Sequence, residues 1–581
     1  MFHTLTGTVL LILAFSGYAV AIYDFLRIPK YFVPLAVVLL LSIASFCFGI
    51  LNLMRLGVYC SVGVGLFLFL KTVLIHKRDH KKFSFNLIYL PAVLLLVYGL
   101  YFLSGGTFAD GDTMTHWGVI VREMAGTNRL PNFLTTEVAY KTYPPLSACW
   151  IYFVTRCVGY SENASLLAQY LFTFSCVITI MQLWSRASEN WGAILSLLCC
   201  LFLFTFSNIP IDDLKVDNLV TLLTVAGCSY IAFLNTKING SKLKNSDLYI
   251  LGGIVFSLPL IKSSGLFFSV FIIVLFFGMF VYEKRESSVV QLCFLALLPF
   301  LALLIWNGHT DLVFAKANES RHSFSIDYML NVFAHRPKEE FLLITKNFIS
   351  KWFSFNGSLE WISLLGLAIS FSIYYVVKRK GVGVFLIIII FYLFYKCSLW
   401  GMYCFNMPDS DAIILGAYKR YQLTYSLICI YFSLYFLLAI TPQTRGKEIA
   451  IYCSSLVFSL LCLTLSNSHK NLIRPNYEAD GVSRQLATII KESKNQGLSI
   501  YRDSALVYTP KPYASFFVQF AFRNWKGEGT SDINKIIQAL QTKDPKFDLV
   551  IVPSDKEGEV RKFVNGYKQF RAQNFLILKL K

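Results

Sequence analysis

Long apolar blocks, separated by short polar segments, run through most of this chain. Each block is about 17–23 residues long, the length that a helix needs to cross a hydrocarbon core of about 30 Å. Apolar residues make up 55% of the 581 residues and charged residues only 15%. A soluble protein would carry roughly 25% charged residues. We therefore expect an all-α polytopic membrane protein.

The blocks define fourteen candidate transmembrane spans. Their approximate limits are 6–24, 32–53, 57–75, 86–103, 163–184, 191–208, 219–235, 248–262, 265–281, 289–306, 361–377, 383–399, 421–440 and 448–466.

Lysine and arginine are concentrated in short loops, where they mark the cytoplasmic side of a membrane protein. The segment "HKRDHKK" after the third span is the strongest such marker. Alternate counting from it places "RIPK", "NTKINGSKLKNSD", "YEKRESS", "VKRKG" and "TPQTRGK" on the same side. The long segments 104–162, 307–360 and 400–420 and the tail from 467 then face outside, as do both termini. This pattern predicts a multi-pass protein of a bacterial cytoplasmic (inner) membrane.

The formal net charge of +19 does not indicate nucleic acid as a partner, because the basic residues are those that set the orientation. The 14 cysteines form no CxxC pair and lie in or beside apolar blocks. We interpret them as small apolar fillers rather than metal ligands or a disulfide framework. The first apolar run has no basic residue before it, so we expect an uncleaved first span rather than a signal peptide.

The polar tail differs from the rest of the chain and predicts a small α/β domain. "VSRQLATIIKESK" and "INKIIQALQTK" have helical periodicity, whereas "LSIYRD", "FDLVIVP" and "NFLILKLK" are typical of strands.

The stretch "FADGDTMTHWG" places two carboxylates and a histidine at the edge of the bilayer. Acidic groups there are costly and are commonly functional. From Asp112 onward the sequence predicts a helix in which Asp112 and His116, four apart, share a face. An apolar stripe on this helix predicts that it lies on the outer membrane surface; the stripe consists of Met114, Trp117, Val121 and Met124. An acidic cap on such a helix is also an ordinary structural feature.

A second segment, "VAYKTYPPLSACWIYFVTRCVGYSE", follows in the same loop. Residues 145–158 are too few to span the bilayer easily, so we expect a surface helix or a re-entrant segment. Tyr143 is either an interfacial anchor or a substrate contact.

These two segments together resemble the first periplasmic loop of GT-C glycosyltransferases, such as aminoarabinose transferases and protein O-mannosyltransferases. In that family an acidic residue opens a juxtamembrane helix and a "YPP"-like element precedes the next core span. "LKVDNLVTLLTVAG" is similar to the family's acidic element at the start of a core span, with Asp217 at the acidic position. "LPLIKSSGLFF" is similar to its basic-x-x-Gly turn, with Lys262 and Gly265.

The resemblance covers roughly residues 86–281 and has three departures. Three spans precede the usual first one, Thr113 stands where the family has Glu, and Asp110 adds a carboxylate two residues early. It implies N-terminal extra helices over 1–85, a GT-C-like core over 86–466 and an extracytoplasmic α/β domain over 467–581.

The resemblance also implies a reaction, in which a sugar moves from a polyprenyl phosphate to an envelope glycan, lipid or protein on the outer face. Asp112 or Asp110 would be the general base, and cations would stabilise the phosphate leaving group. Candidate substrate-binding residues, several of which could instead be ordinary residues at helix ends, are His116, Tyr143, Asp217, Lys262, Arg321, His322, Lys419 and Arg420. No cofactor is implied. A divalent metal at the acidic residues stays open as an alternative, but such a donor does not demand one and no ligand cluster supports it.

Two other functions stay open. An O-antigen-type polymerase or ligase acting on diphosphate-linked glycans would depend on arginines in 307–360, which holds Arg321 and Arg336. A transporter or lipid flippase would be expected to show paired halves and ionisable groups at mid-membrane depth. The suggestive charges lie instead at span ends on one side.

Overall fold

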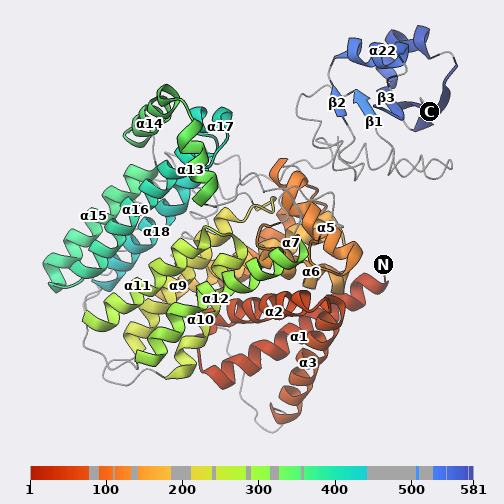
Figure 1. The fold of residues 1–581 in the computed structure, drawn as a ribbon. Coiled ribbons are helices and arrows are strands. Elements are labelled where there is room, and N and C mark those ends of the chain that lie inside the picture. The colour runs from red at the N-terminus through yellow and green to blue at the C-terminus, as the bar shows by residue number, and fades with distance from the viewer. Residues whose placement is uncertain are drawn as a thin grey trace.

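The structure is a computed structural model (Figure 1). It describes residues 2–76, 90–108, 111–132, 142–184, 211–237, 244–282, 289–314, 326–354, 359–440, 505–508, 528–530, 532–542, 544, 546–564, 566–572 and 575–579.

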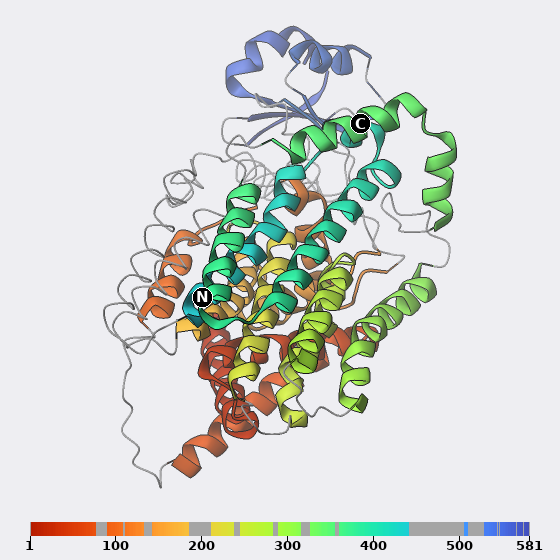
Figure 2. The ribbon, with the colours of Figure 1, turned by 90° about the vertical axis from the view of Figure 1, so that its left-hand side faces the viewer.

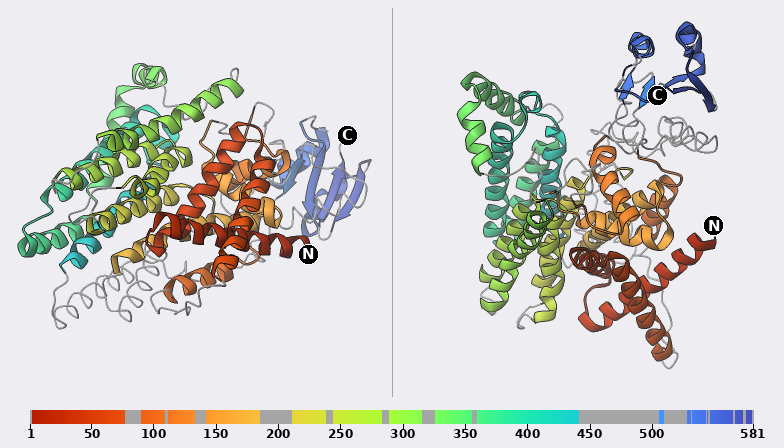
Figure 3. Two further views of the ribbon diagram at one scale, coloured as in Figure 1. Left: turned by 90° about the horizontal axis from the view of Figure 1, so that it is seen from below. Right: turned by 45° about the vertical axis from the view of Figure 1, so that its right-hand side comes forward.

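Three long helices open the chain: α1 (Phe2–Leu26), α2 (Val33–Ile50) and α3 (Met54–His76), with the short helix η1 (Lys30–Phe32) before α2. α1 packs against α3, and α2 packs against α6 (Leu146–Val158) and α7 (Glu162–Ile180). Pro34 follows the first residue of α2, a position where its missing N–H costs no helical hydrogen bond. These helices lie on one side of the helical body, at the lower right in the right-hand view of Figure 3.

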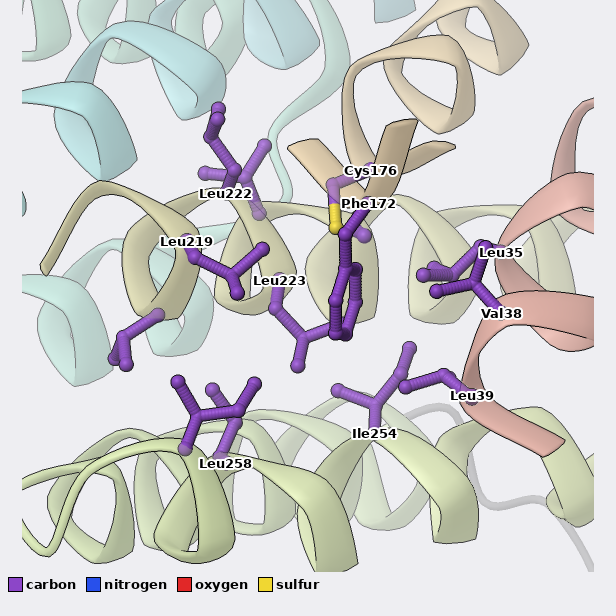
Figure 4. Packing of buried hydrophobic residues seen from close by; sticks show 14 of the residues in the cluster. Leu35, Val38, Leu39, Phe172, Cys176, Leu219, Leu222, Leu223, Ile254 and Leu258 are labelled. Carbon is purple, nitrogen blue, oxygen red and sulfur yellow. The ribbon is translucent and has the colours of Figure 1, made fainter. Parts of the chain in front are cut away.

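The central helices are α4 (Leu90–Phe102), α7 with its continuation η4 (Met181–Trp184), α9 (Asp217–Lys237), α10 (Asn245–Ile261), α11 (Gly265–Tyr282) and α12 (Val289–Val313). α9 packs against α7, α10 and α11, which places it at the centre of the body. Its Leu222 and Leu223 are fully buried, and so are Phe172 of α7 and Ile254 of α10. Figure 4 shows these side chains meeting in one apolar core.

The last group comprises α13 (Ile326–His335), α14 (Lys338–Trp352), α15 (Leu359–Lys378), α16 (Val382–Phe405), α17 (Asp409–Ile414) and α18 (Tyr418–Ala439). α18 packs against α15 and also against α9, so it joins this group to the centre. α14 lies across the end of α16, where Ile344 and Phe348 pack on Leu399 and Tyr403 (Figure 2).

Helices occupy twelve of the fourteen predicted spans; the other two, 191–208 and 448–466, lie outside the described residues. Within the described part of the chain, nine helices are long and apolar enough to cross a membrane. Four further apolar helices are shorter, namely α4, α6, α10 and α11. The predicted all-α multi-pass membrane architecture is therefore confirmed.

The two short helices of the first long loop differ from the prediction. A π-helical turn, η3 (Thr113–Trp117), leads into α5 (Gly118–Thr127). The apolar stripe over Met114–Met124 is buried, but α5 packs against α6 and α7, so this stripe faces protein rather than lipid. Residues 146–155 of α6 are all buried, so this helix packs inside the protein against α1, α2 and α7 rather than lying on its surface.

The C-terminal domain contains a five-stranded sheet in the order β2-β1-β3-β5-β4. Its strands are β1 (Ala505–Tyr508), β2 (Glu528–Thr530), β3 (Leu549–Pro553), β4 (Lys568–Ala572) and β5 (Phe575–Lys579). β1 pairs in parallel with β2 and β3, and β3, β5 and β4 pair antiparallel. Helix α22 (Ile533–Thr542) buries Ile536 and Leu540 in the domain's own core.

This domain confirms the predicted α/β character. Three expected elements appear as α22, β3 and β5, whereas the predicted elements "VSRQLATIIKESK" and "LSIYRD" lie outside the described residues. The sequence analysis missed β1 and β2, which have only four and three residues, and β4, whose sequence KQFRA contains a single large apolar residue.

Candidate functional site

Four of the predicted site residues come together in one group, which we call the charged cluster: Asp112, Asp217, Lys262 and Arg420. Arg420 Nη1 lies 2.7 Å from Asp112 Oδ2, and Arg420 Nε lies 3.4 Å from Asp217 Oδ2. Lys262 Nζ lies 2.5 Å from Asp217 Oδ1. Two carboxylates and two cations from four distant segments therefore form a continuous chain of ion pairs.

The cluster forms where four helix ends meet. Asp112 directly precedes η3, Asp217 is the first residue of α9, Lys262 directly follows α10 and Arg420 is the third residue of α18. The orientation derived from the basic loops predicted all four at the same face. Because α18 packs against α9, Arg420 is held beside Asp217.

Gly265 allows the turn that carries Lys262. Its N–H donates to the Lys262 carbonyl at 2.7 Å. A Cβ atom at Gly265 would lie 2.1 Å from the Leu258 carbonyl oxygen, far inside van der Waals contact. Any other residue would therefore push α11 away from the end of α10.

Tyr421 lies under both cations of the cluster. Lys262 Nζ is 5.4 Å and the Arg420 guanidinium carbon 5.5 Å from the centre of its ring. Both distances fall in the range of cation–π attraction. The Tyr395 hydroxyl on α16 donates to the Tyr421 carbonyl at 2.8 Å, which fixes this part of α18.

Asp112 is the accessible member of the cluster. Its side chain is 54% exposed, against 28% for Arg420, 22% for Lys262 and 11% for Asp217. Asp217 thus acts as the inner anchor for both cations, while the carboxylate of Asp112 can be reached from solvent. An accessible carboxylate next to fixed cations can accept a proton beside a bound anion.

The side chain of Thr113, the residue after Asp112, binds the segment before α9. The Thr113 hydroxyl accepts a hydrogen bond from the Leu214 N–H at 3.1 Å. Nearby, Lys215 Nζ lies 3.4 Å from Asp213 Oδ2. A small recess between α7, the segment before α9 and the start of α9 is lined by Gln169, Tyr170, Thr173, Ile211, Asp213, Lys215, Asn218 and Leu219.

His116 does not share an exposed face with Asp112, contrary to the prediction. Its side chain is buried because Tyr143 and Trp117 cover it, with ring centres 4.8 Å and 4.5 Å away and both rings edge-on. This burial lowers the pKa of His116 to about 3, which keeps the imidazole neutral at physiological pH. His116 and Trp117 of η3 therefore form one aromatic group with Tyr143.

A second charged group, which we call the buried network, was missed by the sequence analysis. Lys396 Nζ lies 2.5 Å from Glu360 Oε1, and these side chains are only 1% and 3% exposed. The Tyr392 hydroxyl and the Gln422 amide also donate to the Glu360 carboxylate, at 2.6 Å and 2.7 Å. Lys396 also lies 5.2 Å from the ring centre of Tyr418.

The buried network flanks Arg420 along α18. Tyr418 and Gln422 stand two residues before and two residues after it. The only sequence signal for this network was a single lysine inside the apolar block "FYLFYKCSLW" and a glutamate at the start of the preceding span. An ionisable side chain within a span is expected to pair with another group. The sequence did not show that Glu360 is the partner of Lys396.

The remaining predicted residues do not join the cluster. Lys419 is exposed at the start of α18, and Asp110, Arg321 and His322 lie outside the described residues. Arg336 has a structural role, because its guanidinium donates to the carbonyls of Tyr403, Cys404 and Met407 and to Asp409. In the described ranges, no three side chains of His, Cys, Asp or Glu come together in a way that could hold a metal ion.

Comparison with known proteins gives matches among solved structures. No protein-family model and no curated protein matches the chain. The crystal structure of ArnT from Cupriavidus metallidurans in the apo state matches with a TM-score of 0.44 and 12% identity. The structure of the same protein bound to undecaprenyl phosphate matches with a TM-score of 0.40 and 11% identity. Each match covers 85% of this chain and 98% of the other.

Proposed function

We propose that the chain is an inverting membrane glycosyltransferase that moves a sugar from a polyprenyl phosphate to a hydroxyl of a cell-envelope glycan, lipid or protein. One observation carries the proposal: an accessible carboxylate, Asp112, lies 2.7 Å from an arginine that is anchored at one end of the helical body. The motif resemblance over residues 86–281 supplies the reaction class, and the catalytic face is the predicted outer one.

In this reaction Asp112 is the general base. Its carboxylate takes the proton from the acceptor hydroxyl as the acceptor oxygen forms a bond to the anomeric carbon. The bond between that carbon and the phosphate oxygen breaks, and its electron pair leaves with the polyprenyl phosphate. A single displacement of this kind inverts the anomeric centre.

Arg420 and Lys262 would stabilise the phosphate as its negative charge develops. Arginine can bind phosphate with two parallel hydrogen bonds, whereas lysine acts as a point charge. Arg420 is paired with Asp112 in this structure, so a bound phosphate would compete with that carboxylate. When the donor binds, its phosphate would replace the Asp112 carboxylate as the partner of Arg420, and Asp112 would then be free to act as the base.

The cluster needs further positive charge to hold a phosphate, since its two carboxylates balance its two cations. We assign this role to Lys419, which is exposed and directly precedes Arg420 in α18. Its position at the beginning of α18 also suits contact with a charged group at the membrane surface. The Asp217 carboxylate would keep Arg420 and Lys262 oriented throughout.

Substitution of the base tests this proposal. The full-length protein would be purified in detergent and assayed with a polyprenyl-phosphate sugar and candidate envelope acceptors. Asp112→Asn keeps the size of the side chain but removes its basicity, so transfer should fall by about 100-fold or more. Asp110→Asn is assayed in parallel, because the two carboxylates are two residues apart.

Asp311→Asn is the matched control. Asp311 is an exposed carboxylate near the end of α12, on the same predicted face. The control should keep wild-type activity. Full activity in both Asp112→Asn and Asp110→Asn would show that the proposed chemistry is wrong.

The donor distinguishes this function from the polymerase or ligase alternative. A monophosphate-linked single sugar should be consumed, and a diphosphate-linked oligosaccharide should not. The described residues add no support to the alternative, because Arg336 is fully engaged by protein acceptors around the end of α16. Use of the diphosphate-linked donor alone would favour that alternative.

A further inference from the structure

Two arginines outside the charged cluster share one tyrosine hydroxyl. Arg55, near the start of α3, donates from Nε to Tyr59 Oη at 3.2 Å. Arg156, near the end of α6, donates from Nη2 to the same oxygen at 3.2 Å. The guanidinium carbons also lie 5.6 Å and 5.9 Å from the centre of the Tyr59 ring. Two like charges from helices far apart in sequence are thus held around a single oxygen.

Arg55 and Arg156 carry positive charge that the hydroxyl of Tyr59 does not neutralise. Tyr59 is an uncharged acceptor, and among the described residues no carboxylate forms an ion pair with Arg55 or Arg156. Each guanidinium has five N–H donors and uses one of them on the phenol oxygen. Like charges this close repel each other, so an anion bound between them would be stabilised.

The surface next to the pair is apolar and continues down α3. Leu56, Tyr59, Phe67, Leu70 and Leu74 recur at helical spacing and are each at least 50% exposed. A Cβ atom at Gly63, in the middle of this face, would meet nothing within 4 Å. From Tyr59 to Leu74 the face is about 22 Å long at 1.5 Å per residue, enough for the acyl chain of one leaflet.

We propose that Arg55 and Arg156 form a binding site for the phosphate of an anionic membrane lipid whose acyl chain lies along the exposed face of α3. The two guanidinium groups would clasp the phosphate oxygens, and the apolar face would contact the chain. The continuous apolar face is what favours a lipid over free phosphate. The site is separate from the charged cluster and shares no residue with it.

Competition between lipids tests the site. Purified full-length protein would be incubated with equal amounts of phosphatidylglycerol and phosphatidylcholine of the same chain length, and bound lipid counted by native mass spectrometry. Wild-type protein should retain phosphatidylglycerol preferentially. In the double variant Arg55→Gln/Arg156→Gln, the ratio of bound phosphatidylglycerol to bound phosphatidylcholine should fall about tenfold, because two charge-assisted contacts are removed.

A double variant with the same change in net charge serves as the control. Lys346→Gln/Arg379→Gln removes two exposed cations elsewhere, and Arg379 also lies over a tyrosine ring, that of Tyr375 at 5.7 Å. It should keep the wild-type preference. If both double variants lost the preference for phosphatidylglycerol equally, the preference would depend only on the overall charge of the protein, and the proposal would be overturned. An unchanged preference in Arg55→Gln/Arg156→Gln would also overturn it.

Inorganic phosphate distinguishes the two sources of the anion. At millimolar concentration it should leave the bound phosphatidylglycerol in place, because the apolar face contributes to lipid binding. Displacement of the lipid by inorganic phosphate alone would show that the arginines bind free phosphate, and the lipid assignment would fall.

Discussion

Arg420 contacts Asp112 at 2.7 Å, although the two residues are 308 positions apart in the sequence. The same guanidinium reaches Asp217 through a different nitrogen, so it bridges a half-exposed carboxylate and an almost buried one. Arginine suits this position because its rigid, planar group presents donors along several directions. The arrangement makes Arg420 the residue that joins α18 to the candidate base.

Two substitutions of Arg420 should therefore distinguish the effect of its positive charge on sugar transfer from the effect of its planar guanidinium geometry. Arg420→Lys keeps the charge, but a single ammonium cannot reproduce two contacts made through Nη1 and Nε, so we expect kcat for sugar transfer to fall about tenfold. Arg420→Gln removes the charge and should lower kcat by about 100-fold or more. Steady-state transfer assays measure both. Wild-type kcat in Arg420→Lys would show that bridging is not required.

The buried network predicts a non-additive effect on stability. Glu360→Gln or Lys396→Met alone leaves a buried charge without its partner, which should destabilise the protein by about 3–5 kcal/mol. The double variant removes both charges and should be closer to wild type than the sum of the single effects. Unfolding in detergent, followed by tryptophan fluorescence, measures all three. Strict additivity would contradict the pairing.

Gly265 should tolerate no side chain. In Gly265→Ala the new methyl group would overlap the Leu258 carbonyl, so α10 and α11 must separate and Lys262 must move from Asp217. We expect a loss of folded protein and a clear fall in melting temperature. Gly308→Ala in α12 is the control, because a Cβ atom there meets nothing within 4 Å. Size-exclusion profiles and thermal melts report the difference.

His116 predicts a pH dependence of stability. Burial lowers its pKa to about 3, well below the ordinary value of 6.5, so the unfolded chain binds a proton more readily than the folded one. Stability should therefore be full above about pH 6.5 and fall as the pH decreases below it, by at most about 1.4 kcal/mol per pH unit.

His116→Phe should flatten this dependence, because an aromatic ring without a titrating group would occupy the same place between Trp117 and Tyr143. His335→Gln is the control, since His335 is exposed at the end of α13. Thermal melts between pH 5 and pH 8 compare the variants. An unchanged slope in His116→Phe would assign the effect to other groups.

Sequence reasoning located the helices well because lipid imposes a strong and simple requirement. A block of about 20 apolar residues can satisfy its backbone hydrogen bonds in a bilayer as a helix, so composition alone finds it. Alternation of the basic loops then assigned Asp112, Asp217, Lys262 and Arg420 to the same face. The contacts among these four residues in the charged cluster agree with their assignment to one face.

Burial was predicted less well, because it depends on what packs against a helix rather than on the helix itself. His116 appeared to lie on a polar face, but Tyr143 from a later segment covers it. The stripe of α5 looked suited to lipid, but α6 and α7 occupy that side. The partner of Lys396 could not be found either, because Glu360 becomes its neighbour only when α15 and α16 both pack against α18.

The long separation between Asp112 and Arg420 also bears on biosynthesis. A ribosome adds about 5–20 residues each second, so roughly 15–60 s pass between the synthesis of the two residues. During that interval the early helices are already in the bilayer, while the arginine that will pair with Asp112 does not yet exist. A chain interrupted anywhere before α18 would carry its acidic residue without this counter-ion, and a nascent chain would acquire the complete charged cluster only after α18 has been synthesised.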